Sequence, residues 1–316
     1  MSLASKLLAR DGFVLMYGTT PPRSGSPAEL IRGAAEKLAE RVRPLPLDGF
    51  VVYDLQDESA RTSAPRPFPF APTVDSRGYA KLLDELTGRS AVCYKCIARM
   101  THAEWREWLG DTRRDYGLEL LTLVGRPSSQ KIPYAMTLTQ AYSIAAGHDS
   151  RFVLGGVAIA ERHGVGRDES RRLHDKTDVG CRFFVSQTVY QPAATIRMLS
   201  GYAALCRKLG RAPARIVLTF APCGRAKTMD FMRWLGIAIP EETERAILGS
   251  PAPLSKSIEI CSENLRQILD QDYVHELPLG VNTESVSINK EEIDASVDLF
   301  QALKDVLDRR EQALRA

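Results

Sequence analysis

Short runs of apolar residues alternate along the chain with longer stretches in which apolar residues recur every three to four positions. Short apolar runs predict buried strands, and the longer amphipathic stretches predict helices. Eight strands are predicted, at residues 13–17, 50–54, 91–97, 118–124, 152–159, 183–186, 216–220 and 277–281. Helices are predicted at residues 27–42, 76–86, 102–116, 137–146, 168–177, 193–209, 227–235, 241–248, 257–270 and 293–313.

A strand followed by helical sequence, eight times over, favours a single (β/α)8 TIM barrel over residues 1–316 with an extra C-terminal helix. Residues 57–73 are rich in Pro and Ser, so they are predicted to form a long loop after the second strand. No G-x-G-x-x-G follows the first strand, and the chain has no G-x-x-x-x-G-K-[ST]. A Rossmann fold and nucleotide hydrolysis are therefore disfavoured.

Composition excludes several other classes of protein. Hydrophobic residues at 44% and charged residues at 26% are typical of a folded globular protein rather than a disordered one. No apolar run reaches the ~18 residues of a membrane helix, and the start lacks a secretory signal, so we expect a cytoplasmic protein without a membrane partner. The net charge of +3 is small and interspersed, which argues against nucleic acid as a partner. The His residues lack metal-ligand spacing, so no metal site is predicted.

Ligands of TIM barrels gather at the carboxyl ends of the strands, and this position selects candidate site residues. Asp54 and Lys95 end the second and third strands, where they would form either a catalytic pair or an ordinary salt bridge. Glu161 and His163 follow the fifth strand, whose Gly155-Gly156 pair would either admit a flat ligand or permit tight packing.

Other candidates follow the later strands. The Gln187 amide can both donate and accept, as recognition of a heterocycle edge requires, or it can satisfy a loop backbone. Lys176, near the end of a predicted helix, would either meet an anionic group or simply favour the helix dipole. Tyr190, Thr219 and Asn282 belong to the strand-end stretches 187–190, 219–223 and 282–285.

Four segments resemble the methylenetetrahydrofolate reductase family, and the resemblance spans nearly the whole chain. They are Pro21-Pro22-Arg23; residues 155–163, similar to a Gly-Tyr-Pro-Glu-x-His segment; residues 169–187, similar to an acid-x(3)-Leu-x(2)-Lys-x-Asp-x-Gly run that ends in a strand and Gln; and the linker at 235–241. The family is a (β/α)8 barrel enzyme that usually carries FAD. It reduces methylenetetrahydrofolate to methyltetrahydrofolate with NAD(P)H.

The resemblance implies an oxidoreductase of one-carbon metabolism and methionine biosynthesis that interconverts 5,10-methylenetetrahydrofolate and 5-methyltetrahydrofolate. The substrate would be a reduced folate, and the cofactors FAD and NAD(P)H. By the resemblance, Gln187 would contact the folate, and the strand-end residues Tyr190, Thr219 and Asn282 are further candidate folate-binding residues. By the resemblance, His163, Glu169 and Lys176 would lie near the flavin phosphates and ribityl chain, and the strand-end residues Lys95 and Arg126 are further candidate cofactor-binding residues.

The sequence departs from the family at several functional positions. The glutamate that normally precedes Pro-Pro-Arg is Gly18, and Val124-Gly125-Arg126 stands in place of Arg-Gly-Asp. A glycine transfers no proton, so Asp54 or Glu161 would have to act as the catalytic acid. Arg126 would hold a folate glutamate tail or a cofactor phosphate.

These departures leave several functions open. Without a conventional FAD site, NAD(P)H would transfer hydride to the folate directly. The alternatives are a folate-dependent methyl or one-carbon transfer enzyme and a non-catalytic folate- or flavin-binding regulator. The sequence also leaves open whether the chain forms a homo-oligomer.

Overall fold

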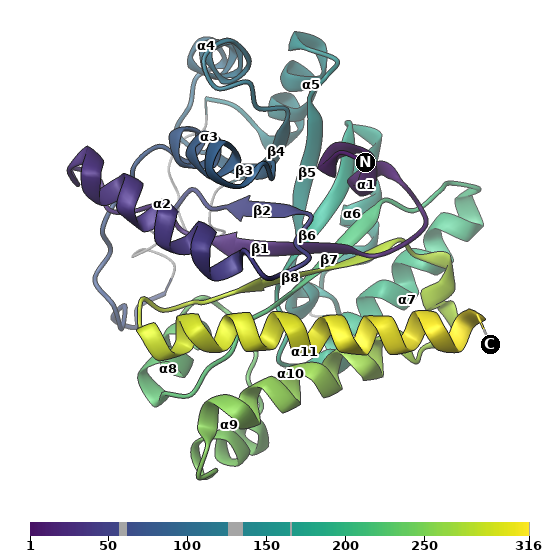
Figure 1. Cartoon of the computed structure of the whole chain (residues 1–316). Coiled ribbons are helices and arrows are strands. Elements are labelled where there is room, and N and C mark those ends of the chain that lie inside the picture. The colour runs from purple at the N-terminus through teal and green to yellow at the C-terminus, as the bar shows by residue number, and fades with distance from the viewer. Residues whose placement is uncertain (57–61, 126–134, 165, 316) are drawn as a thin grey trace. The chain divides into compact units, whose positions relative to one another are not determined.

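The computed structural model describes residues 1–56, 62–125, 135–164 and 166–315 (Figure 1). Its eight strands form one closed barrel in the order β1-β2-β3-β4-β5-β6-β7-β8, with parallel pairing of neighbours. The predicted (β/α)8 barrel is therefore confirmed. The strands are β1 Val14–Thr19, β2 Gly49–Val52, β3 Ala91–Cys96, β4 Leu120–Val124, β5 Val153–Ala158, β6 Cys181–Thr188, β7 Arg215–Phe220 and β8 Leu279–Glu284.

Helices follow the strands in the predicted order. They are α1 Leu3–Leu8, α2 Ala28–Val42, α3 Ser76–Thr87, α4 His102–Arg114, α5 Leu138–His148, α6 Glu169–Asp178, α7 Pro192–Leu209, α8 Ala226–Trp234, α9 Glu241–Leu248, α10 Pro253–Leu269 and α11 Lys290–Arg315, with short 3-10 helices η2 Ala160–Arg162 and η3 Asp272–Glu276. Local chemistry fixes several helix ends. Thr101 and Thr137 form capping boxes that start α4 and α5, and Gly88 and Gly210 end α3 and α7 in the left-handed conformation.

Three differences from the predicted elements have simple causes. Helix α1 is too short to show periodicity, but Leu3 and Leu7 on it are buried. Strands β6 and β8 continue past their predicted ends. Their last residues are polar, so the apolar run that predicts each strand stops earlier. Strand β2 ends at Val52, so Asp54 lies just after the strand. In the described part of the Pro-rich loop, 62–73, an isolated bridge joins Thr73 to Arg23.

Contacts along the chain group into two compact units. The first unit contains Met1–Leu8, Gly18–Val157 and Asp175–Phe184, and the second contains Ala9–Tyr17, Ala158–His174 and Val185–Ala316. In the second unit, α10 and α11 pack side by side (Figure 1), and the Tyr17 hydroxyl of β1 is hydrogen-bonded to Ser296 on α11. Within the described residues, no helix combines the length and the apolar character needed to cross a membrane.

The two glycines of β5 are required for packing in the first unit. A Cβ on Gly155 would lie 2.6 Å from the Thr122 hydroxyl and would also meet the Phe183 ring. A Cβ on Gly156 would lie 3.0 Å from the Tyr142 hydroxyl oxygen. Side chains of the protein itself thus occupy this space, which supports the packing interpretation of the Gly155-Gly156 pair over the approach of a flat ligand.

This packing predicts that Gly155→Ala lowers the free energy of unfolding by about 1–3 kcal/mol, because the added methyl overpacks a rigid core. Gly33→Ala is the matched control, because nothing lies near a Cβ at that position of α2 and alanine favours a helix by up to about 1 kcal/mol. Urea unfolding of both variants measures the difference. Equal stability of the two variants would contradict the packing account.

Candidate functional site

Asp54 and Lys95 approach each other at the ends of β2 and β3 in the first unit. The Asp54 Oδ2 atom accepts a hydrogen bond of 2.8 Å from the Cys96 backbone N–H and lies 3.9 Å from Lys95 Nζ. Asp54 Oδ1 accepts a hydrogen bond from the Gln56 amide at 3.0 Å. Both carboxylate oxygens therefore have partners within the protein, as expected for the salt-bridge interpretation of this pair.

Lys95 and Arg77 both stack on one aromatic ring, that of Trp108. Lys95 Nζ lies 5.3 Å from the centre of the Trp108 ring, and the Arg77 guanidinium lies 4.6 Å from the same ring. Arg77 also donates to both Asp75 carboxylate oxygens. Burial alone would raise the pKa of Asp75, but its hydrogen bonds with Arg77 outweigh burial and hold the pKa below its usual range. This stack fixes the position of Lys95 from the side of α3 and α4.

The side-chain amide of Gln187, in the second unit, has a hydrogen-bond partner for its nitrogen but, among the described residues, none for its oxygen. Its Nε2 donates to the Leu235 carbonyl at 2.8 Å, which is the loop-backbone role foreseen for it. Its Oε1 is buried and accepts no hydrogen bond from any residue that the structure describes. A buried amide oxygen without a donor is costly, so this atom can accept a hydrogen bond from an incoming N–H group.

Glu161 contacts the same loop as Gln187. The Ala238 backbone N–H donates to the Glu161 carboxylate, three residues beyond the carbonyl that Gln187 binds. Burial raises the pKa of Glu161 above its ordinary value, against the lowering effect of its backbone hydrogen bonds and of Arg162. A carboxyl with a raised pKa retains its proton closer to neutral pH, as a general acid requires. Residues 235–240 thus connect an amide acceptor and an acid.

Polar side chains at the ends of β6, β7 and β8 form a second group in this unit. Asn282 Nδ2 donates to the Thr219 hydroxyl at 3.3 Å and lies 3.5 Å from Glu284 Oε2, while the Thr188 hydroxyl lies 3.3 Å from Glu284 Oε1. Thr219, Asn282 and Thr188 are nearly inaccessible to solvent, and Glu284 is only half-buried. Thr188 and Glu284 fall within the strand-end stretches, but nothing in the periodicity distinguishes them from their neighbours.

Tyr190 lies outside this polar group. Its side chain is 1% exposed, and its hydroxyl donates to the Ala221 carbonyl at 2.8 Å. Burial raises the pKa of Tyr190 well above its ordinary value. Its hydroxyl therefore bonds within the core to the backbone just after β7.

Two of the residues expected near a flavin, Glu169 and Lys176, are bonded to other parts of the protein. Glu169 is fully buried and accepts hydrogen bonds from the Ile159 backbone N–H and from Arg172, both at 3.2 Å. Lys176 Nζ donates to the Val157 carbonyl at 2.7 Å, and His163 Nδ1 lies 3.7 Å from Asp168. Arg126 lies outside the described residues. The Glu169 and Lys176 side chains do not fit the role of flavin contacts.

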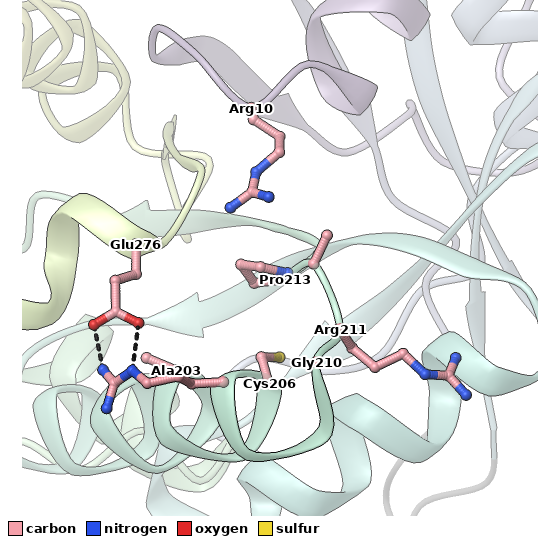
Figure 2. Close-up of a pocket in the computed structure, with 9 residues that line it drawn as sticks. Arg10, Ala203, Cys206, Gly210, Arg211, Pro213 and Glu276 are labelled. Atoms are coloured by element: carbon pink, nitrogen blue, oxygen red, sulfur yellow. Dashed lines mark hydrogen bonds and ion pairs between the residues drawn. The ribbon is translucent and has the colours of Figure 1, made fainter.

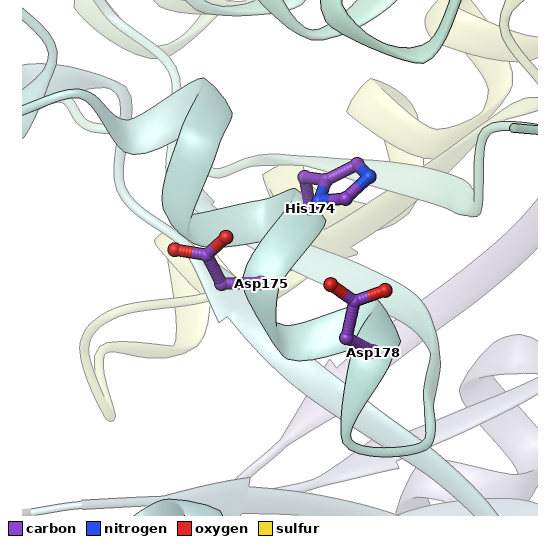
Figure 3. A group of neighbouring side chains, drawn as sticks. All are labelled: His174, Asp175 and Asp178. Carbon is purple, nitrogen blue, oxygen red and sulfur yellow. The ribbon is translucent and has the colours of Figure 1, made fainter. Parts of the chain in front are cut away.

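Two other groups of charged residues are present, one on α6 and one in a pocket. His174, Asp175 and Asp178 on α6 bring one ligand atom each within 4.8 Å of one another, but both carboxylates are exposed, and we assign no metal to them (Figure 3). A pocket of about 340 Å³ in the second unit is lined by Arg10, Ala203, Cys206, Arg207, Gly210, Arg211, Ala212, Pro213 and Glu276 (Figure 2). It lies beside the residues that precede β1 and β7, whereas TIM-barrel active sites lie at the carboxyl ends of strands.

Comparison with known proteins shows that the chain is similar to a solved structure that binds a folate. No protein-family model and no curated protein matches the chain. An uncharacterized protein from Clostridium thermocellum, which binds two copies of 5-methyl-5,6,7,8-tetrahydrofolic acid, is 31% identical with a TM-score of 0.82. The match covers 96% of this chain and 99% of that protein.

Two glycosidases share the fold alone. A beta-1,4-mannanase is 12% identical with a TM-score of 0.50, and the match covers 95% of this chain and 98% of the mannanase. The catalytic domain of a chitinase from Pyrococcus furiosus is 10% identical with a TM-score of 0.54, over 96% of this chain and 98% of that domain.

The raised pKa of Glu161 predicts a pH-dependent effect on stability. Because the folded state holds this proton more tightly than the unfolded chain, ionisation of Glu161 costs stability as pH rises from the ordinary carboxyl value of 4.5 through the raised pKa. Glu161→Gln should therefore raise the thermal midpoint relative to the wild type at pH 8, and the difference should shrink at pH 4. Glu242→Gln, on the exposed side of α9, is the control. A difference that does not vary with pH would be inconsistent with the raised pKa.

Proposed function

The chain belongs to the same family as the Clostridium thermocellum protein that binds 5-methyltetrahydrofolate, and from this premise we propose that it binds a reduced folate. The observation in this chain that supports the proposal is Gln187 Oε1, a buried acceptor at the end of β6, the strand whose last residue, Thr188, belongs to the polar group with Thr219, Asn282 and Glu284. A pterin ring is flat and edged with N–H donors and acceptors. Polar groups of this kind, fixed at the end of a barrel, suit such a ring.

We propose further that the protein is a methylenetetrahydrofolate reductase-like oxidoreductase. The methylene carbon of 5,10-methylenetetrahydrofolate bridges N5 and N10. In the reaction, the bond from this carbon to N10 breaks, a proton goes to N10, and a hydride from NAD(P)H adds to the carbon. The products are 5-methyltetrahydrofolate and the oxidised nicotinamide. The step needs an acid near N10 and a fixed pterin.

Glu161 is the better of the two candidate acids. Burial raises the pKa of its carboxyl, and its hydrogen bond with the Ala238 N–H fixes its position on the loop that Gln187 also binds. Both oxygens of Asp54, in contrast, accept hydrogen bonds from neighbours, and one of them lies near the Lys95 ammonium. The proposed acid is therefore Glu161, and Asp54 positions Lys95.

Direct transfer of hydride from nicotinamide to folate suits this chain better than a flavin relay. Glu169 and Lys176, at the positions that resemble flavin contacts, are bound to backbone groups of β5 and its following turn. No step of the proposed reaction passes through FAD. The nicotinamide supplies the hydride, and the protein supplies orientation and the proton.

A non-catalytic folate-binding protein is the second candidate. The observation in its favour is that Gly18, at the end of β1, has no side chain with which to donate a proton. In that case Gln187 would bind the pterin in the same way, and Glu161 would be a structural carboxyl. A measurement of turnover separates the two candidates.

Purified protein should oxidise NADH or NADPH only when 5,10-methylenetetrahydrofolate is present, and should do so without a flavin band in its visible spectrum. Glu161→Gln should lower kcat by about 10²- to 10⁴-fold, because the proton donor is lost. Wild-type kcat should fall with rising pH as Glu161 ionises, and the variant should lose this dependence. Glu242→Gln should retain full activity.

Three results would count against this proposal. Absence of turnover together with tight folate binding would favour the non-catalytic candidate. A tightly bound flavin, required for turnover, would contradict direct transfer. Full activity of Glu161→Gln would leave the reaction intact but remove Glu161 as the acid.

Substitution of Gln187 tests the folate site itself. Gln187→Ala removes the buried acceptor and should weaken the binding of 5-methyltetrahydrofolate by about 10-fold, as measured by calorimetry. Unchanged affinity would show that the Gln187 amide serves only the Leu235 carbonyl. The thermal midpoint of the variant reports the loss of that internal hydrogen bond separately.

A further inference from the structure

We propose that the pocket of about 340 Å³ beside Arg10, called the Arg10 pocket below, is a second ligand site that binds a small molecule through a carboxylate or phosphate group. The inference goes beyond the proposed function, because the pocket lies at the amino ends of strands, whereas the folate site is proposed at their carboxyl ends. Pockets for small molecules usually have volumes of about 300–1,000 Å³, so this one suits a small ligand.

The walls of the Arg10 pocket come from three segments of the second unit that each precede a strand. Arg10 precedes β1, residues 211–213 precede β7, and Glu276 precedes β8. The end of α7 forms the floor, where the Ala203 and Cys206 side chains are almost completely buried (Figure 2). The pocket therefore combines a small apolar floor with charged side chains around it.

Arg215 fixes the backbone on both sides of Arg10. Arg215 stands at the start of β7 and is 1% exposed. Its guanidinium donates to the carbonyls of Ala9 at 2.7 Å, Asp11 at 3.2 Å and Gly12 at 2.9 Å. Burial of a guanidinium is costly, and these hydrogen bonds offset part of the cost. Arg10 therefore extends from an anchored segment of the chain.

The Arg10 side chain points toward the floor of the pocket (Figure 2). Burial raises the pKa of the Cys206 thiol, and the positive charge of Arg10 counteracts part of this rise. Interactions between charges weaken with distance, so the Arg10 guanidinium lies near the thiol. A ligand on the floor of the pocket would thus meet the Arg10 guanidinium.

Arg10 supplies a positive charge that no carboxylate of the described residues compensates by an ion pair. The other charged pair of the pocket is closed, since Arg207 donates to both carboxylate oxygens of Glu276, with Nε 3.1 Å from Oε2. These hydrogen bonds hold the pKa of Glu276 below its usual range. Arg207 compensates the negative charge of Glu276, and Arg10 remains to attract an anion.

Backbone N–H groups cap carbonyls at the end of α7, beside the pocket. The Gly210 N–H donates to the Arg207 carbonyl at 3.2 Å, and the Arg211 N–H donates to the Cys206 carbonyl at 2.9 Å. Free carbonyls give a helix end its partial negative charge, so these hydrogen bonds reduce its repulsion of an anion.

The groups of the Arg10 pocket define the chemical class of the ligand. A guanidinium presents parallel N–H donors that bind two oxygens of a carboxylate or phosphate in a charge-assisted pair. The Ala203 and Cys206 side chains offer apolar contact to a short carbon skeleton. A small carboxylic acid or a small phosphate ester has both of these parts.

Titration with two dianions tests the site and distinguishes the two classes of ligand. Inorganic phosphate and succinate are each added at pH 8 and constant ionic strength, and binding is measured by calorimetry and by the rise of the thermal midpoint. The wild type should bind at least one of them, phosphate if the ligand is a phosphate ester and succinate if it is a carboxylic acid. Arg10→Gln should weaken this binding by about 10-fold or more, because the charge-assisted pair is lost.

Lys208→Gln is the matched control, since Lys208 is an exposed cation at the same end of α7 but does not line the pocket. This variant should bind the probe as the wild type does. The inference would be overturned if the wild type bound neither dianion at millimolar concentration, or if Arg10→Gln bound as tightly as the wild type. Equal losses of affinity in Arg10→Gln and Lys208→Gln would also overturn it, because they would report net charge instead of a site.

Discussion

Closure of a barrel of parallel strands is the constraint on which the rest of this structure depends. In a closed barrel every strand has two hydrogen-bonded neighbours, so the backbone leaves no edge exposed and the last residues of all strands come to one end. Apolar side chains fill most of the middle of each strand, and polar side chains gather at the strand ends. The polar ends of β6 and β8 are therefore where ligand chemistry is possible, and they are also the residues that the apolar pattern does not mark as strand.

Polar groups of the second unit are connected to one another through short backbone segments. Residues 235–240 offer a carbonyl to Gln187 and an N–H to Glu161, so a single loop orients both side chains. The Asn282 amide links Thr219 to Glu284 in the same way. These hydrogen bonds fix the positions of Gln187, Glu161 and Glu284 before any ligand binds. Binding and proton transfer require such preorganisation.

The barrel could be predicted from the sequence because strand and helix periodicities differ and alternate along its whole length. The roles of individual site residues could not be predicted in the same way, since position at a strand end does not say where a side chain finds its partner. Glu169 and Lys176 lie at positions suited to a cofactor, yet they bind the backbone of neighbouring segments. The Tyr190 hydroxyl likewise donates to the Ala221 carbonyl. These partners are distant in sequence, and only the folded chain reveals them.

Transfer of an isotopic label tests the central claim most directly, namely that nicotinamide passes hydride to a reduced folate held by this barrel. Protein free of flavin is incubated with 5,10-methylenetetrahydrofolate and NADH deuterated at the transferred position, and the product is analysed by mass spectrometry. The account predicts 5-methyltetrahydrofolate with a single deuterium in its methyl group. Unlabelled methyl product, or none at all while the folate is bound, would contradict it.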